Sequence, residues 1–411
     1  MHMAVVGRWV CVALMLTTGS ALAETKVDGP KNGPKNVAKE PAPAAVADMT
    51  KHIEKVLGEK NEVAYLDTQL GDIVNDLELR TRLNIELDVA ALTADGKGTE
   101  TVFTFSTKDA SLQSILNQLL SKQGLTWIVA DEAVIITTQA GAEARAPTKA
   151  YSVATLAAKA DSLEFDELSE MIMQAVDPTS WRANGGSAGA IARISAKKSL
   201  VVTQTHANHL MIAELLKQVA APLPFSGEKP QIAGGDDAVA RIEAELQRKS
   251  DVQYLDTQLS DVVNDLELRH KVKIHLDIPA LTDDGKGPET VFNKTLNNMS
   301  FASILDLLLV EHGLRWTIAD EAILITTENG EAKRPTSVAY SVAELADSEG
   351  NIDYEEIVDM LTQSVAPESW REAGGLIGTI SRLSSKQAIV VTQSYANQRK
   401  IQAILKQLAE K

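Results

Sequence analysis

The sequence contains almost no cysteine, few aromatic residues and fewer basic than acidic residues. Its single cysteine, Cys11, lies near the N-terminus, so the remainder holds neither a disulfide nor a metal site built from cysteine ligands. Aromatic residues are 4% of the chain, which predicts cores made of aliphatic side chains. With 40 Lys and Arg against 56 Asp and Glu, the formal net charge of −16 disfavours nucleic acid and anionic lipid as partners.

Long apolar runs are scarce as well. The one near the start, Trp9 to Leu16, follows Arg8 and precedes Ala21-Leu22-Ala23, which is the order of features in a secretory signal. A run of roughly ten residues is too short to cross about 30 Å of hydrocarbon as a helix. We therefore expect residues 1–23 to be a signal peptide cleaved after Ala23. The mature protein would then lie in the periplasm or outside the cell, without a membrane span.

The chain contains a long internal repeat. The stretch from Tyr65 to Asp88 returns as Tyr254 to Asp277, at an offset of 189 residues, and the same offset carries Gln204 onto Gln393 without an insertion. A repeat of this kind shows that one structural unit has been copied whole. It also provides a test, because a residue that the fold requires should occur in both copies.

The first part of each copy alternates between strand and helix patterns. After a short strand at 65–67, Thr68 is placed to cap a helix whose apolar residues Leu70, Ile73, Val74 and Leu77 have one-face spacing. The alternating segment 84–88 predicts a strand paired with 101–105, and a second helix at 112–120 precedes two strands that turn at Asp131-Glu132. We predict a β-α-β-β-α-β-β module at 47–139 and again at 237–327, each with a leading helix.

The second part of each copy predicts a smaller module. Residues 150–221 read as a strand, a helix, a Trp-Gly loop, two strands and a final helix, a β-α-β-β-α order that returns at 338–411. Polar, Pro- and Gly-containing segments at 24–46, 140–149, 222–236 and 328–337 are predicted as linkers. The predicted fold class is α+β, with two tandem copies of this pair of modules.

These strings resemble a known family. DTQLGDIVNDLELRTRLNIELD followed by SLQSILNQLLSKQGLTWIVADEAVIITT is similar to the STN or N0 module of secretins and TonB-dependent transducers. KAYSVATL and AIARISAKKSLVVTQTHANHLMIAELLKQV resemble the KH-like N1 module that follows it in secretins. We call these the STN-like and N1-like modules. The resemblance implies envelope modules that work by protein contact, as in secreted planctomycete-type proteins with tandem secretin-like modules. Because the sequence ends after the second N1-like module, we expect the secretin pore to be absent.

One loop is a candidate interaction site in both copies. The segments 177–189 and 366–378 keep the same residues after a predicted helix: Trp181, Arg182, Gly185 and Gly186, then Trp370, Arg371, Gly374 and Gly375. Trp and Arg dominate binding hot spots, and paired glycines allow a loop to adapt to a partner. A Trp after a helix end can equally close a small core, so contact and core plug both remain open for this loop.

Other polar groups are better explained by structure than by chemistry. His206 and His209 are spaced to share a metal, but no third ligand is nearby, and we expect a solvated helix face. The DGKG segments at 95–98 and 284–287 are interpreted as hairpin turns between strands, and Asp72, Asp76 and Glu78 as the solvent side of a helix. No Ser-His-Asp or Cys-His arrangement is visible. The sequence thus predicts no catalytic residues, no cofactor and no metal.

Three functions follow from these features. The first is a secreted, non-enzymatic protein-protein interaction protein of the bacterial envelope, monomeric or weakly self-associating. The second is an accessory subunit of an outer-membrane secretion or transport complex containing a secretin or a TonB-dependent receptor. The third, a secreted hydrolase, would need a concave pocket with convergent polar groups. We expect neither a core shared between the two copies nor a polar cavity built from side chains unique to one of them.

Overall fold

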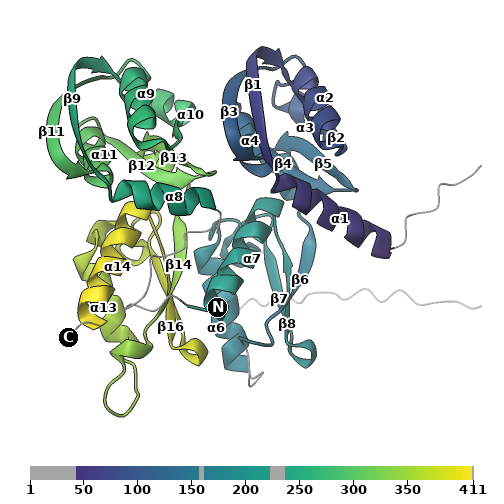
Figure 1. The fold of residues 1–411 in the computed structure, drawn as a ribbon. Coiled ribbons are helices and arrows are strands. Elements are labelled where there is room, and N and C mark those ends of the chain that lie inside the picture. Colours follow the sequence, from purple (N-terminus) through teal and green to yellow (C-terminus); the bar gives the residue numbers. More distant parts are fainter. Residues whose placement is uncertain (1–42, 157–161, 223–236, 410–411) are drawn as a thin grey trace, which may run out of the picture. The chain divides into compact units, whose positions relative to one another are not determined.

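The computed structural model describes residues 43–156, 162–222 and 237–409 (Figure 1). The expected signal peptide, most of the linker at 24–46 and most of the linker at 222–236 lie outside these residues. The described residues form an α+β fold in which the second copy repeats the element order of the first. No helix within these ranges combines the length and the hydropathy needed to traverse a bilayer.

The first STN-like module contains two small sheets. Helix α1 (Pro43–Leu57) precedes β1 (Lys60–Gln69), α2 (Leu70–Thr81), β2 (Ile85–Leu87), α3 (Val89–Ala94), β3 (Val102–Ser111), α4 (Leu112–Ser121), β4 (Leu125–Ala130) and β5 (Ala133–Thr138). Strands β1 and β3 pair antiparallel as a two-stranded ribbon. The other sheet has the order β2-β5-β4, with β2 parallel to β5. The predicted order of strands and main helices is confirmed, with α3 as an addition.

Helix α3 corrects two predictions about the middle of this module. The segment 84–88 does not pair with 101–105, because β3 pairs with β1 and β2 pairs with β5. The reason is local: the Asp88 carboxylate accepts a hydrogen bond from Ala91 N at 3.3 Å and starts α3, which carries the chain away from β2. The DGKG segment therefore follows a helix, and its interpretation as a hairpin turn between strands is wrong.

The start of α2 also differs from prediction. The helix begins at Leu70, and the capping position is Gln69, which makes no side-chain cap hydrogen bond. The Thr68 hydroxyl instead donates to the Leu66 carbonyl oxygen at 3.2 Å. The Leu70 N–H is satisfied by the Thr101 carbonyl oxygen at 2.8 Å, so a backbone group next to β3 replaces the threonine side chain that was expected to cap the helix.

The core of the module is aliphatic, as the composition predicts. The one-face residues of α2, namely Leu70, Ile73, Val74 and Leu77, are all buried, and so is Trp127 on β4. Burying an aliphatic side chain of this size contributes about 1.5–3 kcal/mol, so this single helix face stabilises the module substantially. The Trp127 indole Nε1 donates to Asn117 Oδ1 at 2.7 Å, which satisfies the ring's only polar atom.

The second copy repeats this module. It contains α8 (Asp237–Leu246), β9 (Lys249–Gln258), α9 (Leu259–His270), β10 (Ile274–Leu276), α10 (Ile278–Asp283), β11 (Val291–Ser300), α11 (Phe301–Val310), β12 (Leu314–Ala319) and β13 (Ala322–Thr327). Its ribbon is β9-β11 and its other sheet has the order β10-β13-β12. The equivalence of the two copies therefore extends from sequence to strand pairing.

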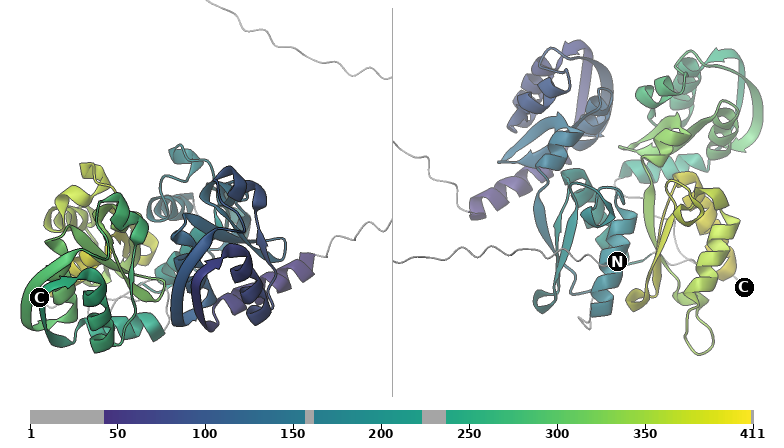
Figure 2. Two further views of the ribbon diagram at one scale, coloured as in Figure 1. Left: turned by 90° about the horizontal axis from the view of Figure 1, so that it is seen from above. Right: turned by 180° about the vertical axis from the view of Figure 1, so that it is seen from behind.

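The N1-like modules have the predicted β-α-β-β-α order. The first contains β6 (Thr148–Ser152), α6 (Ser162–Ala175), β7 (Ala190–Ile194), β8 (Ser199–Thr203) and α7 (His206–Ala220). The second contains β14 (Thr336–Ser341), α13 (Tyr354–Ser364), β15 (Thr379–Leu383), β16 (Ala388–Gln393) and α14 (Tyr395–Ala409), with α13 and α14 on one face of its sheet (Figure 2). The segments predicted as linkers at 140–149 and 328–337 include parts of two short helices, α5 (Gln139–Ala144) and α12 (Glu328–Ala332).

The two copies are not separate bodies, which corrects the expectation of independent cores. Helix α6 of the first N1-like module lies against the sheet β14-β16-β15 of the second, and Ala339, Leu383 and Val390 share one hydrophobic cluster with Met171 (Figures 1 and 2). The two STN-like modules do not share a core with each other, and Tyr395 of α14 joins the core of the second one. A shared core was not predictable, because the repeat shows which residues are equivalent but not which faces meet.

Candidate functional site

The Trp-Gly-Gly loops are held by their own Trp and Gly residues. Trp181 and Trp370 are buried, and each indole Nε1 donates to a backbone carbonyl at 2.7 Å, that of Val176 and Val365 respectively. A Cβ on Gly186 would lie 2.3 Å from the carbonyl carbon of Ser180, so only glycine fits there. The Trp and Gly shared by the two copies therefore fix the loop conformation.

The arginines of these loops are the parts that face solvent. Arg182 and Arg371 are both exposed, and the Nε of Arg182 donates to the Ser187 carbonyl oxygen at 3.1 Å. A partner would therefore meet the guanidinium groups and the backbone of the loop, while the indole rings lie beneath. A role of these loops in binding stays a prediction.

The two histidines of α7 are buried, and their prediction as a solvated helix face is wrong. His206 packs against Trp127 with ring centroids 4.9 Å apart, and burial lowers its pKa to about 4. His209 lies between the Tyr151 hydroxyl at 2.8 Å and the Pro147 carbonyl oxygen at 2.9 Å. The N1-like module turns this end of α7 toward β4, a contact that helix periodicity does not reveal. The described residues contain no cluster of three or more His, Asp or Glu suited to a metal ion.

The acidic residues of α2 attach the helix to its neighbouring strands. Asp76 accepts a hydrogen bond from the Tyr65 hydroxyl at 2.9 Å, and Glu78 Oε1 accepts one from Ile85 N at 2.9 Å. The Tyr254–Asp265 bond of the second copy has the same 2.9 Å length. Asp76 and Glu78 are only partly exposed, which corrects their prediction as solvent-facing residues, whereas Asp72 is exposed as predicted.

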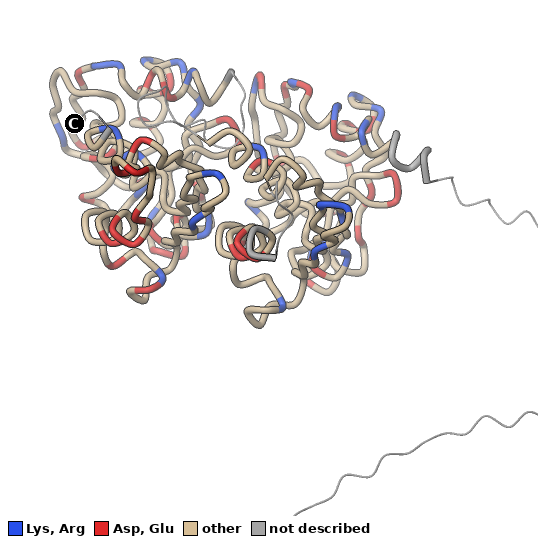
Figure 3. Tube along the Cα trace, turned by 90° about the horizontal axis from the view of Figure 1, so that it is seen from below, with Lys and Arg blue, Asp and Glu red and all other residues tan. Residues whose placement is uncertain are grey.

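Sequence reasoning missed a set of exposed apolar residues that occurs in both copies. Leu66 is 78% exposed and its equivalent Leu255 is 69% exposed. Three further pairs at equivalent positions are also exposed: Leu79 and Leu268, Val102 and Val291, and Val89 and Ile278. Figure 3 shows that Lys and Arg are interspersed with Asp and Glu along both copies.

A strand irregularity holds the exposed leucine of each ribbon in place. The pairing of β1 with β3 shifts between Tyr65 and Thr68, and Asp67 there adopts a φ of 47°. The N–H of Asp67 donates to Thr104 Oγ1 at 3.1 Å, and the Thr104 hydroxyl donates to Asp67 Oδ1 at 2.9 Å. Strand alternation then places Leu66 on the solvent face, opposite the buried Tyr65 ring.

The second copy keeps this bulge with a different partner. Asn293 replaces threonine, and its side chain makes the same two bonds with Asp256, at 2.8 Å to the backbone N–H and at 3.0 Å to Oδ1. Asp256 has a φ of 48°. The same geometry from a different side chain indicates that the bulge itself is the retained feature. We call the solvent face of each ribbon around Leu66 and Val102, or Leu255 and Val291, the bulge face.

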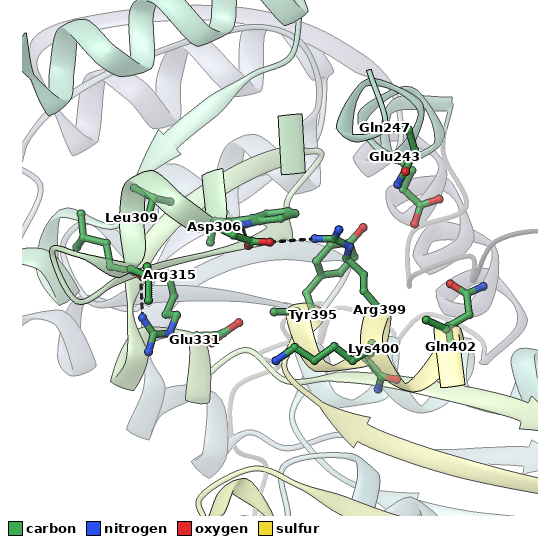
Figure 4. A pocket seen from close by; sticks show the side chains of 16 residues that line it. Glu243, Gln247, Asp306, Leu309, Arg315, Glu331, Tyr395, Arg399, Lys400 and Gln402 are labelled. Carbon is green, nitrogen blue, oxygen red and sulfur yellow. Dashed lines mark hydrogen bonds and ion pairs between the residues drawn. The ribbon is translucent and has the colours of Figure 1, made fainter. Parts of the chain in front are cut away.

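A polar cleft occurs where the second STN-like module meets α14 (Figure 4). It has a volume of about 700 Å³, within the range of small-molecule sites. Trp316 and Tyr395 form its aromatic part, with ring centroids 5.3 Å apart. Its charged lining residues include Asp306, Arg315, Glu331, Arg399 and Lys400.

This cleft contradicts the expectation that neither copy builds a polar cavity of its own. The equivalents of Arg315, Glu331 and Arg399 in the first copy are Thr126, Ala142 and Leu210, none of which carries a charge. Asp306 is engaged, because it accepts the Trp316 Nε1 hydrogen at 2.7 Å and lies 3.6 Å from Arg399 Nη1. Glu331 is 6% exposed, and its Oε1 has no hydrogen-bond partner among the described residues.

Glu331 should make stability depend on pH. Burial raises its pKa to about 7, so the folded state favours the neutral acid; this contribution is complete below the unfolded pKa and is lost as pH rises through about 7. Glu331→Gln should therefore stabilise the protein at pH 8 by on the order of 2 kcal/mol, and have little effect at pH 4. Urea unfolding at both pH values measures this. The exposed Glu328→Gln is the control, and an equal effect of the two variants at pH 8 would contradict the assignment.

No protein-family model and no curated protein matches the chain. Among solved structures, it is similar to the secretin structure described as XcpQN012, at 15% identity over 52% of this chain and 81% of that one, with a TM-score of 0.15. It is also similar to the N-terminal domain of the secretin XcpQ from Pseudomonas aeruginosa, at 10% identity over 86% and 98%, TM-score 0.15. A third is the GspC–GspD complex of the type II secretion system of enterotoxigenic Escherichia coli, at 14% identity over 39% and 99%, TM-score 0.15. Two of these three structures are of XcpQ, a secretin.

Proposed function

We propose that this protein is a secreted, non-enzymatic interaction protein of the bacterial envelope, and that each STN-like module binds a protein partner through its bulge face. The observation that carries this proposal is that both copies expose the same leucine, Leu66 or Leu255, from the same bulge. Exposed apolar residues are common singly on protein surfaces, but the bulge face carries two equivalent pairs, Leu66 with Leu255 and Val102 with Val291, which distinguishes it from chance exposure.

The surrounding sequence supports a role beyond folding. From Tyr65 to Arg80 the two copies differ only at Gly71 and Ile73, which are Ser260 and Val262 in the second copy. Exposed positions are thus retained along with the buried ones, whereas an exposed position just beyond this stretch, Asn84, is replaced by the charged Lys273 in the second copy. Retention of exposed leucine fits a requirement for contact with another molecule.

Hydrogen bonds at the edges of the ribbon favour a partner that binds on its face over one that adds a strand at its edge. Lys122 Nζ donates to the Thr104 carbonyl oxygen at 3.1 Å, and Gln123 Nε2 donates to that of Val102 at 3.3 Å. On β1, Arg80 Nη1 donates to the Glu62 carbonyl oxygen at 3.2 Å. Side chains thus already occupy backbone acceptors that a docking strand would use. A partner with an apolar pocket for the leucine side chain suits the bulge face better.

Photo-crosslinking tests the proposal. A photoreactive phenylalanine derivative replaces Leu66 or Leu255 in cells that make the native protein, and captured proteins are identified by mass spectrometry. We expect positions 66 and 255 to capture envelope proteins that position 376 does not. Leu376 is the matched control, because it is an exposed leucine whose equivalent in the first copy is Ser187. Capture of the same proteins at all three positions, or of none at 66 and 255, would refute the proposal.

A double variant tests how much the two leucines contribute to the free energy of binding. Leu66→Ser with Leu255→Ser should reduce affinity for the captured partner at least tenfold, since burying each leucine side chain against a partner contributes about 1–2 kcal/mol. The free energy of unfolding should change by less than about 0.5 kcal/mol, because both side chains lie at the surface. Affinity by calorimetry and stability by urea titration separate the two effects. A large decrease in stability would mean that the leucines serve the fold.

The cleft of the second copy supports a second candidate, the binding of a small ligand. Arg315, Arg399 and Lys400 offer cations beside the aromatic rings, and Glu331 offers a carboxyl oxygen without a partner among the described residues. Hydrolysis is less well supported than binding, because Asp306 is already held by Trp316 and Arg399 and leaves Glu331 without a second free carboxylate. Native mass spectrometry of protein purified from its own envelope should show a bound mass that Arg399→Ala loses. Its absence would remove this candidate.

A further inference from the structure

The contact between the two N1-like modules is a helix on a sheet. On α6, the residues Glu167, Met171 and Gln174 form one stripe and face the second module. Glu167 accepts hydrogen bonds from Ser384 N at 3.2 Å and from Ser384 Oγ at 3.0 Å, and Gln174 Oε1 accepts one from Ser381 Oγ at 2.7 Å. Met171 is fully buried between these polar ends. The stripe therefore has an apolar centre, Met171, with hydrogen-bonded residues at both ends, Glu167 and Gln174.

The same helix stripe exists on the second copy and is accessible there. Counting 189 residues on from α6 leads to Glu356, Met360 and Gln363 on α13, which are the same residue types in the same spacing. Glu356 and Gln363 are exposed and Met360 is half-buried. The stripe that the first copy buries is thus presented to solvent by the second.

The receiving sheet face is also present twice, and within the part of the chain that the structure describes only one of the two is covered by a helix. In the second module, Ala339, Leu383 and Val390 lie in the cluster with α6. Their equivalents in the first module, Ala150, Ile194 and Val201, are at least partly exposed. Ile194 is 44% exposed, whereas Leu383 is fully buried. The sheet β6-β8-β7 therefore has an open apolar face of the kind that α6 covers on its copy.

From these two unfilled halves of one interface we infer that the protein self-associates head to tail, with α13 of one molecule on the sheet β6-β8-β7 of the next. The occupant is a second copy of this chain because the chain already contains the complementary pair in contact. The two surfaces differ, so the contact is heterologous and each new molecule again presents one open stripe and one open face. Such an interface adds molecules in one direction and closes only if the rotation forms a ring.

Two differences between the copies make this contact weaker than the internal one. The hydroxyl of Ser381, which holds Gln174, is replaced by Ala192, whereas Ser384 is kept as Ser195 opposite Glu356. Between the STN-like modules, Asn117 Nδ2 donates to Asp320 Oδ1 at 2.8 Å. In the equivalent contact between two molecules, Asp306 would take the place of Asn117 and Asp131 the place of Asp320. Two carboxylates repel each other where an amide and a carboxylate attract. We therefore expect reversible association that depends on concentration.

Sedimentation of the purified chain over a concentration series tests this. Wild type should show mass increasing with concentration, and Ile194→Asp and Met360→Asp should each weaken association at least tenfold, since each buries a charge in the new contact. Mixing the two variants is the decisive experiment, because it tests whether the two intact surfaces bind each other. Each retains one intact surface, so the mixture should form dimers and nothing larger. A monomeric wild type at every concentration, or a mixture that remains monomeric, overturns the inference.

A gain of association gives a second, independent readout. Asp306→Asn restores the amide that Asn117 supplies, and it keeps an acceptor for Trp316 as Asn117 does for Trp127 at 2.7 Å. We expect it to strengthen association several-fold, and Ala192→Ser to add to it by restoring a hydroxyl for Gln363. Leu376→Asp, on an exposed loop outside both surfaces, should leave association unchanged. Weaker association of Asp306→Asn, or weakened association of Leu376→Asp, would contradict the proposed geometry.

Discussion

Gly375→Ala will unfold the second N1-like module or cost it more than about 3 kcal/mol, because nothing near the new methyl group can give way. An added Cβ would lie 2.2 Å from the carbonyl carbon and 2.3 Å from the carbonyl oxygen of Ser369. Both are backbone atoms of the loop that carries Trp370, so relief requires moving the buried indole ring. Thermal and urea unfolding of the variant measure the decrease in stability.

Gly374→Ala is the matched control for this prediction. Gly374 adopts a φ of 88°, but a Cβ there would meet no atom within 4 Å. The variant should therefore lose only the stability that a non-glycine residue loses at positive φ, about 1–2 kcal/mol. If Gly374→Ala proved as damaging as Gly375→Ala, backbone conformation would outweigh the close approach to Ser369 in this loop.

Met171→Asp will destabilise the protein more strongly than the same change at the equivalent Met360. Met171 is fully buried in the cluster that joins the two N1-like modules, so an aspartate there removes apolar packing and buries a charge without a partner. We expect a destabilisation of more than about 4 kcal/mol and the separation of one unfolding transition into two. Differential scanning calorimetry measures both.

Met360→Asp is the natural comparison, because Met360 is half-buried and its helix stripe faces solvent. The expected cost is about 1 kcal/mol, with a single transition retained. Equal effects of the two variants would mean that the contact of α6 with the sheet β14-β16-β15 contributes little to stability. The same comparison also establishes whether Met360→Asp is folded when it is used in the association experiment.

The sequence carried reliable information where a structure is determined by local pattern or by the repeat. The spacing of Leu70, Ile73, Val74 and Leu77 identified the buried face of α2. The strand and helix order of all four modules followed from the same reasoning. Periodicity succeeds here because the side-chain direction in a helix or strand is fixed by backbone geometry.

Prediction failed where the outcome depends on a partner element distant in sequence. Proximity in sequence pairs the segment 84–88 with the next predicted strand, but α3 intervenes and β2 pairs with β5 instead. The sequence of α7 predicts an exposed His206, because the helix pattern alone does not show that Trp127 of β4 covers it. Strand alternation implies that the bulge leucines are exposed, but it does not say whether their exposure serves a function. Comparison of both copies at exposed positions would have found Leu66 and Leu255 from the sequence alone.

Ile194 and Leu383 show what the sequence repeat determines and what the tertiary structure adds. Both are apolar, both end the equivalent strand, and the repeat alone established that they correspond. Only the tertiary structure decided that α6 covers Leu383 and leaves Ile194 at the surface, because burial of a sheet face depends on which helix reaches it from elsewhere in the chain. By itself the sequence determined the duplicated α+β architecture and its aliphatic cores. The tertiary packing determined which copy of each face is covered, since contact between elements is not encoded in the period of either one.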